Sequence, residues 1–249
     1  MYNIWLISMA LDASFIAKLR KALAKFGDGV SVKAAPLKGR ARMQNKLDDP
    51  DDHALKKRPR PMHNIDTVRA AVVLEDASIM KEVFDAIGAE VGPWLRVKNN
   101  YRAEFDSNEN HGYRALLGNL KFASGLTCKE VFGGENTDTW EALRLSMDST
   151  SDRARVSFAL QSLVDEDKGC RDLECKIAAE VQIIYKPYLT LGRLKSSLYY
   201  KIVRCSAAAE LVRDVASKYE KAAGYHDAEE ACRRVVMRRA AAGGHGDGG

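Results

Sequence analysis

Apolar positions along the chain follow two periods, and their order predicts a sheet flanked by helices. In residues 11–26, Leu11, Phe15, Leu19 and Leu23 recur at helical spacing with lysines between them, which is typical of an amphipathic helix. Short apolar or alternating runs predict strands at residues 30–35, 70–74, 94–101, 113–122 and 172–186. A further helix is expected to start at residue 77 and to end near Gly88. Strands mixed with helices in this way indicate an α+β fold with a mixed sheet rather than a bundle or a sandwich.

The other segments divide the chain into parts around this core. Residues 1–30 are expected to form a strand and a helix that pack on the core, which occupies residues 31–205. Within the core, residues 123–172 contain two helical patterns with serine or threonine caps, which predict an inserted helical pair. A C-terminal helix is expected at 206–240, and the glycine-rich tail at 241–249 is expected to be disordered.

Two polar residues interrupt the last predicted strand. Ala179, Val181 and Ile183 fall on one face of this strand, whereas Glu180 and Gln182 fall on the other. An edge strand with one solvated face is the first explanation. The second is that this polar face forms the floor of a functional site.

Composition and charge narrow the possible partners. Of the 249 residues, 46% are hydrophobic and 29% are charged, as in ordinary globular proteins. The net charge is only +5, but residues 33–46 contain five cations and no acid. Such a local positive field suits a phosphate-bearing ligand, either a nucleotide or a nucleic acid. Five cysteines without Cys-x-x-Cys spacing, the lack of a basic leader and the lack of a membrane-spanning apolar window indicate an intracellular, cytoplasmic protein.

The basic run is the first candidate for a site. Arg42 and Lys46 would share one helix face in this run, with Lys38 and Arg40 before them. Arginine recognises phosphate with two parallel hydrogen bonds, and lysine supplies a mobile point charge. A solvated helix surface is the simpler explanation of the same residues.

Two further candidates lie beside strands. Asp66, at the entrance to the strand at 70–74, is either a helix N-cap or a Mg²⁺ ligand. In the run Gly112-Tyr113-Arg114, the tyrosine could stack on a base and the arginine could supply a cation. A turn glycine followed by a half-buried tyrosine would explain that run equally well.

In their order, these motifs resemble the synthetase domain of the RelA/SpoT family, especially its divergent single-domain members in microbial eukaryotes. The matching features are the Arg-x-Arg-x-x-x-Lys run, an aspartate leading into an apolar strand, a Gly-Tyr-Arg strand, and Glu-Val-Gln-Ile followed by "LYYKIVR", over residues 38–204. The resemblance implies a nucleotidyltransferase-like fold. It also implies a GTP pyrophosphokinase-like activity, which moves pyrophosphate from ATP to the 3′-hydroxyl of GDP or GTP and makes guanosine tetra- or pentaphosphate.

The resemblance also implies a role for individual residues. Asp66, Glu180 and Gln182 would be catalytic, and the carboxylates of Asp66 and Glu180 would hold Mg²⁺. Tyr113 would stack on guanine. The full set of residues expected to bind the nucleotides is Lys38, Arg40, Arg42, Lys46, Tyr113, Arg114 and Lys201.

The chain departs from the family pattern in several places. Ala71 replaces an arginine, Glu109 a lysine and Leu117 a histidine, and the late His-Trp-x-Tyr-Lys motif becomes Ser197-Leu198-Tyr199-Tyr200-Lys201, which keeps only the final pair. These departures leave the identity of the acceptor nucleotide open. The sequence also does not determine the oligomeric state. The alternative function is a catalytically degenerate module that binds nucleotides or RNA through residues 33–46 and the basic segment "RRVVMRR". We favour the enzyme, because a module that only bound RNA would not need paired acids in a basic site.

Overall fold

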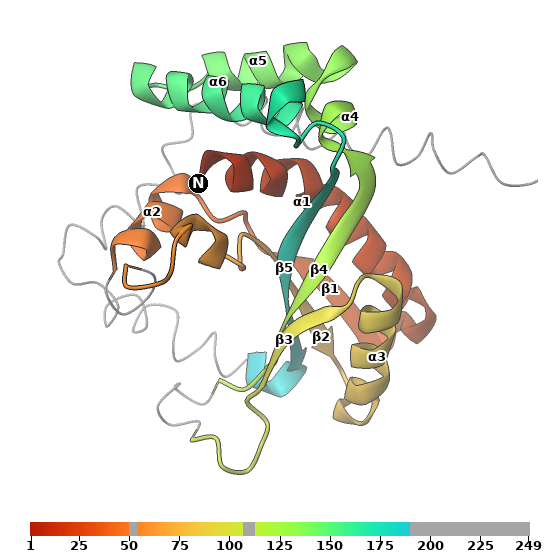
Figure 1. The fold of residues 1–249 in the computed structure, drawn as a ribbon. Coiled ribbons are helices and arrows are strands. Elements are labelled where there is room, and N and C mark those ends of the chain that lie inside the picture. Colours follow the sequence, from red (N-terminus) through yellow and green to blue (C-terminus); the bar gives the residue numbers. More distant parts are fainter. Residues whose placement is uncertain (50–53, 107–112, 190–249) are drawn as a thin grey trace, which may run out of the picture.

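A five-stranded mixed sheet forms the centre of the protein (Figure 1). The computed structural model describes residues 1–49, 54–106 and 113–189. The strands are β1 (Val30–Ala34), β2 (Val68–Leu74), β3 (Trp94–Asn99), β4 (Leu116–Thr127) and β5 (Glu174–Tyr185). They lie in the order β1-β2-β5-β4-β3, in which β2 and β5 are parallel and the other neighbours are antiparallel. The predicted α+β fold with a mixed sheet is confirmed.

Helices cover one face of the sheet and one of its ends. They are α1 (Tyr2–Leu23), α2 (Arg40–Asp48), α3 (Met80–Glu90), α4 (Cys128–Phe132), α5 (Thr137–Leu145) and α6 (Thr150–Val164). The long helix α1 packs against β1, β2, β4 and β5 and against α3. Helices α4, α5 and α6 gather where β4 ends and β5 begins, at the end opposite the loop that follows β3 (Figure 1). None of the described helices combines the length and the apolar character needed to cross a membrane.

The two faces of the sheet differ because apolar residues alternate along the central strands. On the first face, Val68, Ala70 and Val72 of β2 join Val181 and Ile183 of β5 in one buried cluster with α1 and α3. Alternation places the intervening residues of each strand on the second face. The polar residues of β5 therefore lie on the side of the sheet away from α1.

The N-terminal segment forms α1 and a 3₁₀ helix at Ala24–Gly29, and no strand begins before Val30. Helix α1 begins at Tyr2 rather than at residue 11 and ends at Leu23. The prediction that this segment contains a strand before the helix is therefore wrong. Trp5, Leu6, Met9 and the residues next to them are buried around most of the helix. The polar stripe that reveals a helical period is therefore missing from the first ten residues.

The inserted helical pair is present as α5 and α6, and Ser149 caps α6 by accepting a hydrogen bond from the Asp152 amide at 3.1 Å. The structure adds the short helix α4, which starts at a capping box between Thr127 and Glu130. Strand β4 continues to Thr127 and is longer than predicted. The helix expected at 206–240 and the tail at 241–249 lie outside the described residues.

Candidate functional site

A row of polar residues crosses the second face of the sheet over three neighbouring strands. Glu180 of β5 has Arg69 of β2 as its partner on one side and Asn119 of β4 on the other. Residues that are partners in a ladder point to the same face of the sheet. The register therefore brings a cation, a carboxylate and an amide together from parts of the chain that are far apart in sequence.

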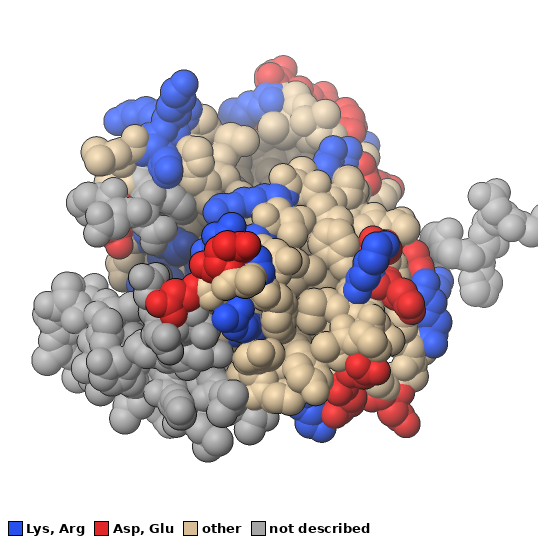
Figure 2. Space-filling view, turned by 90° about the horizontal axis from the view of Figure 1, so that it is seen from below, with Lys and Arg blue, Asp and Glu red and all other residues tan. Residues whose placement is uncertain are grey.

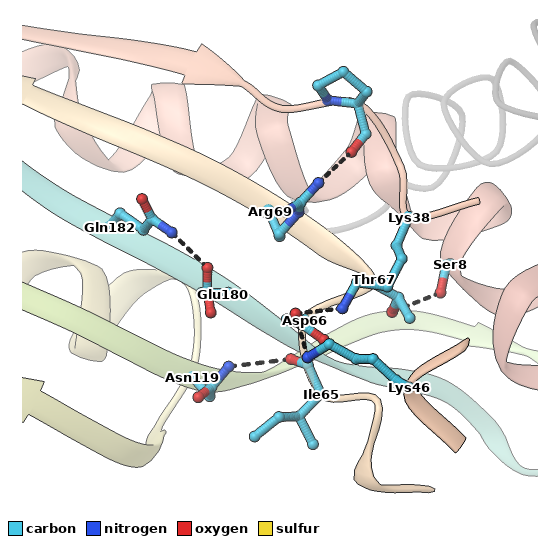
Figure 3. A network of polar contacts seen from close by, with 11 residues as sticks. Ser8, Lys38, Lys46, Ile65, Asp66, Thr67, Arg69, Asn119, Glu180 and Gln182 are labelled. Atoms are coloured by element: carbon cyan, nitrogen blue, oxygen red, sulfur yellow. Dashed lines mark hydrogen bonds and ion pairs between the residues drawn. The ribbon is translucent and has the colours of Figure 1, made fainter. Parts of the chain in front are cut away.

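Asp66, in the turn before β2, is the centre of a small ionic cluster (Figure 3). Its carboxylate forms ion pairs with the ammonium groups of Lys38 and Lys46, the latter at 3.4 Å. Lys46 comes from α2, and Lys38 from the segment before it. The Lys38 amide donates to the Thr67 carbonyl at 3.2 Å and keeps this segment beside β2. The side chains of Lys38, Lys46 and Asp66 are 4%, 18% and 19% exposed.

Burial and charge act differently on the two partners of the closest ion pair. Burial lowers the pKa of Lys38 to about 8, because the attraction of Asp66 only partly offsets the loss of solvation. Burial also opposes the charged form of Asp66. Lys38, then Lys46 and Arg69, outweigh this effect and hold the pKa of Asp66 below its usual value. Asp66 is therefore ionised at neutral pH, as a ligand for a cation must be.

One hydrogen bond links the Asp66 turn to the polar row. The Nδ2 group of Asn119 donates to the Ile65 carbonyl oxygen at 3.1 Å. Asn119 is the ladder partner of Glu180, and Figure 3 shows Asp66, Asn119 and Glu180 on the same side of the strands. The structure thus brings the two predicted carboxylates, Asp66 and Glu180, to one face of the sheet.

A chain of side-chain hydrogen bonds fixes the Glu180 carboxylate from the other direction. The Tyr113 hydroxyl donates to Gln182 Oε1 at 2.7 Å, and Gln182 Nε2 donates to Glu180 Oε1 at 2.7 Å. Gln182 and Glu180 are two residues apart on β5 and share its polar face. Tyr113, Gln182 and Glu180 are therefore brought together as a connected set.

The structure places Arg40 away from this set. Its guanidinium pairs with Asp152 of α6 at 3.0 Å and lies 5.1 Å from the centroid of the Trp5 ring. These contacts tie the start of α2 to α1 and α6. Arg42 is exposed and forms no ion pair with any described residue.

Arg114 is also committed to a structural contact. It donates hydrogen bonds to the carbonyl oxygens of Asn100, Arg102 and Phe105 at 3.1–3.3 Å and holds the loop that follows β3. Lys201, the last residue expected to bind nucleotide, lies outside the described residues.

Two residues of the site were not predicted as site residues from the sequence. Arg69 donates to the Pro36 carbonyl at 3.2 Å and acts electrostatically on Asp66. Asn119 is 8% exposed and makes the link to Ile65. Their alternation with apolar neighbours was a usable signal. The register that sets both beside Glu180 was not, because it pairs Glu180 with residues about 60 and 110 positions away in the sequence.

Comparison with known proteins gives similarity in structure and none in sequence. No family model and no curated protein matches the chain. The fold is similar to that of small alarmone synthetase 2 from Bacillus subtilis, with 14% identity, 96% of each chain covered and a TM-score of 0.49. Small alarmone synthetase 1 from Bacillus subtilis, bound to its product pppGpp, has 11% identity and a TM-score of 0.49, with 95% of this chain and 93% of that chain covered. A GTP pyrophosphokinase family protein from Streptococcus pneumoniae has 12% identity and a TM-score of 0.48, with 97% and 88% covered. These are likenesses of the chain path, and they assign no activity to this protein.

Proposed function

We propose that this protein is a transferase that moves pyrophosphate from ATP to the 3′-hydroxyl of GDP or GTP in a Mg²⁺-dependent reaction. The observation that carries the proposal is the position of Asp66, which is paired with cations and lies on the same face of the sheet as Glu180. Transfer of phosphoryl groups depends on positioning and charge neutralisation more than on covalent participation of the protein. The cluster offers both.

The cations around Asp66 outnumber its single charge. Lys38 and Lys46 pair with the carboxylate, and Arg69 is close enough to lower its pKa. A triphosphate would offer the two lysines several negative charges in exchange for one. The exchange would also release Asp66 to bind a metal ion, so the same cluster serves both parts of a metal–nucleotide complex.

Asp66 and Glu180 suit Mg²⁺ by the chemistry of their donors. This ion takes oxygen ligands, usually one or two carboxylates together with substrate phosphates. The described residues contain no group of three or more His, Cys, Asp or Glu side chains that could hold an ion alone. The protein would therefore supply these two carboxylates and the nucleotide the other ligands. When bound, the ion neutralises charge on the phosphate oxygens.

In the proposed reaction, the 3′-oxygen of the acceptor bonds to the β-phosphorus of ATP. The bond from that phosphorus to the oxygen of the α-phosphate breaks, and AMP leaves. Glu180 would accept the proton of the hydroxyl, in a position maintained by Gln182. Tyr113, fixed by its hydroxyl on Gln182, would present its ring to guanine. Lys38, Lys46 and the exposed Arg42 would bind the ATP phosphates.

The test is transfer of label from ATP labelled in the γ-phosphate to GDP or GTP, with the products separated by chromatography. Wild-type protein with Mg²⁺ should form a labelled guanine nucleotide that is more negatively charged than its acceptor. Asp66→Asn and Glu180→Gln should each slow its formation by at least about 100-fold, as expected for loss of a group that acts on the reacting atoms.

Asp85→Asn is the matched control, because Asp85 is an exposed carboxylate on α3 that pairs with Lys81 at 2.6 Å. This variant should keep the wild-type rate. Wild-type rates in both site variants would refute the site, and no labelled product from wild-type protein with either acceptor would refute the activity.

A further inference from the structure

Asn119 contacts the turn that carries one candidate metal ligand, Asp66, and lies beside the other, Glu180. It is buried on β4, it is the ladder partner of Glu180, and its Nδ2 group donates to the carbonyl oxygen of Ile65, the residue before Asp66 (Figure 3). One side chain therefore connects the strand beside Glu180 to the turn that carries Asp66.

The ladder between β2 and β5 does not itself fix the position of Asp66. The first residue of β2 in register with β5 is Val68, the partner of Ala179. Asp66 lies two residues earlier, in a turn, where no strand pairing sets its distance from Glu180. Its placement depends on its own ion pairs with Lys38 and Lys46 and on the contacts of the residues that flank it.

The flanking contacts connect the turn to different parts of the molecule. On the Thr67 side, the Ser8 hydroxyl of α1 donates to Thr67 Oγ1 at 2.8 Å, and the Lys38 amide donates to the Thr67 carbonyl. Both contacts lead away from β5. On the other side, the hydrogen bond from Asn119 to Ile65 leads directly to the strand next to Glu180.

We infer that Asn119 is a positioning residue that sets the separation of the Asp66 and Glu180 carboxylates and thereby the Mg²⁺-dependent part of ATP binding. This inference rests on the function proposed above. Residues that orient metal ligands through hydrogen bonds commonly change metal affinity by about 10- to 100-fold when they are replaced. Asn119 would do so through a backbone carbonyl, whereas Lys38 and Lys46 contact the Asp66 carboxylate directly.

The test measures the dissociation constant of ATP by calorimetry, with and without Mg²⁺ and without a guanine nucleotide. Wild-type protein should bind ATP more tightly with Mg²⁺. In Asn119→Ala, this gain should fall by about 10-fold or more, whereas binding without Mg²⁺ should stay unchanged because the lysines are intact.

Asn136→Ala is the matched control. Asn136 is 9% exposed, and its Nδ2 group donates to the Glu130 carbonyl at 2.8 Å in the helical insertion. This variant loses an equivalent buried hydrogen bond but should keep the full Mg²⁺ gain. If Asn119→Ala does not fold, Asn119→Leu, which has a similar size and no donor, repeats the measurement.

The outcomes separate this inference from the proposed function. A full Mg²⁺ gain in the Asn119 variants, or an equal loss of ATP binding with and without Mg²⁺, would overturn the positioning role and leave the proposed function standing. A wild-type protein whose ATP binding does not respond to Mg²⁺ would overturn both.

Discussion

Lys38 is a cation in an environment very different from that of a solvated lysine. Its ammonium is almost fully buried, and the carboxylate of Asp66 is its ion-pair partner. Burying a charge costs more than one partner returns unless the group is well paired. The pKa of Lys38 is lowered because of this cost, whereas the pKa of Asp66 is lowered because more than one cation lies near it.

Replacing Lys38 with methionine should change how the stability of the protein depends on pH. The pKa of Lys38 is about 8 in the folded chain, against 10.5 in the unfolded chain. Between these values the unfolded chain binds a proton that the folded chain does not, so this group makes the free energy of unfolding rise with pH. The rise should be on the order of 3 kcal/mol. Urea unfolding at a series of pH values should show wild type gaining this amount over Lys38→Met in that window, and no change below it.

Lys81→Met is the control for this pH series. Asp85 raises the pKa of the exposed Lys81 above 10.5, so stability from this pair is lost only at higher pH. The difference between wild type and Lys81→Met should therefore stay constant from pH 8 to 10.5. A constant difference for Lys38→Met as well would show that Lys38 keeps its proton in the folded protein.

At the scale of elements, two glycines make room for one indole between α3 and the sheet. Trp94 of β3 stacks on Phe84 of α3, with ring centroids 4.6 Å apart, and its Nε1 group donates to the Phe84 carbonyl at 3.3 Å. A Cβ atom at Gly118 of β4 would lie 2.2 Å from the Trp94 ring, and one at Gly88 of α3 would lie 2.8 Å from it. The edge strand β3 is thus joined to α3 through space that only glycine leaves free.

Gly118→Ala should therefore destabilise the protein, by about 1–3 kcal/mol as for other overpacked sites. The added methyl group would displace the Trp94 ring from its stack on Phe84. Denaturant unfolding followed by tryptophan fluorescence would measure both the loss and the change around Trp94. Gly29→Ala is the control, since its Cβ atom would meet only Ile79 Cδ1 at 3.9 Å. Equal stability of the two variants would contradict this account of the packing.

Elements with a clear period were predictable from the sequence, and contacts between elements were not. Alternation in β5 correctly separated Glu180 and Gln182 from their apolar neighbours, and the caps of α6 marked its start. Helix α1 was missed over its first ten residues because burial on most sides leaves no polar stripe. The period was informative only where one face of an element is solvated.

The candidate site shows the same division. Lys46 and Asp66 come together because α2 packs beside the turn before β2, and both were expected in the site. Arg40 is also a cation of the basic run, yet its partner Asp152 lies more than 100 residues further on. The sequence pattern predicts the helix that carries Asp152 but not where that helix packs. Residue type can identify a cation, but the tertiary fold decides which acid it meets.

At the scale of the whole molecule, the positive charge is divided rather than continuous. In Figure 2, basic and acidic residues are interspersed over the described surface that faces the viewer. Within the basic run at 33–46, Lys38 and Lys46 pair with Asp66, and Arg40 pairs with Asp152. Lys33 and Arg42 are the members of the run that form no ion pair with a described residue. This distribution favours a compact phosphate ligand over an extended one.

The division of charge leads to a prediction about RNA, the ligand of the alternative function. Each phosphate contacted on a single strand adds about −0.7 to the slope of log affinity against log salt concentration. With two cations that pair with none of the described residues, the run at 33–46 should give single-stranded RNA a slope no steeper than about −1.4. The measurement is fluorescence anisotropy with Arg233, Arg234, Arg238 and Arg239 replaced by alanine, so that the C-terminal basic segment does not contribute.

Asp66→Asn sharpens the distinction between the two functions, because it removes the acid that now occupies Lys38 and Lys46. If the run served RNA, losing this acid would strengthen RNA binding and steepen its salt dependence, since two more cations would meet phosphate. If the run serves ATP with Mg²⁺, the same change removes a metal ligand and lowers the Mg²⁺-dependent part of ATP binding. We expect the second result. Two results together would assign the basic run to nucleic acid: tight RNA binding with a slope near −3 in Asp66→Asn, and ATP binding that does not change with Mg²⁺. The cations of the run would then bind an extended polyanion and not the metal–nucleotide complex.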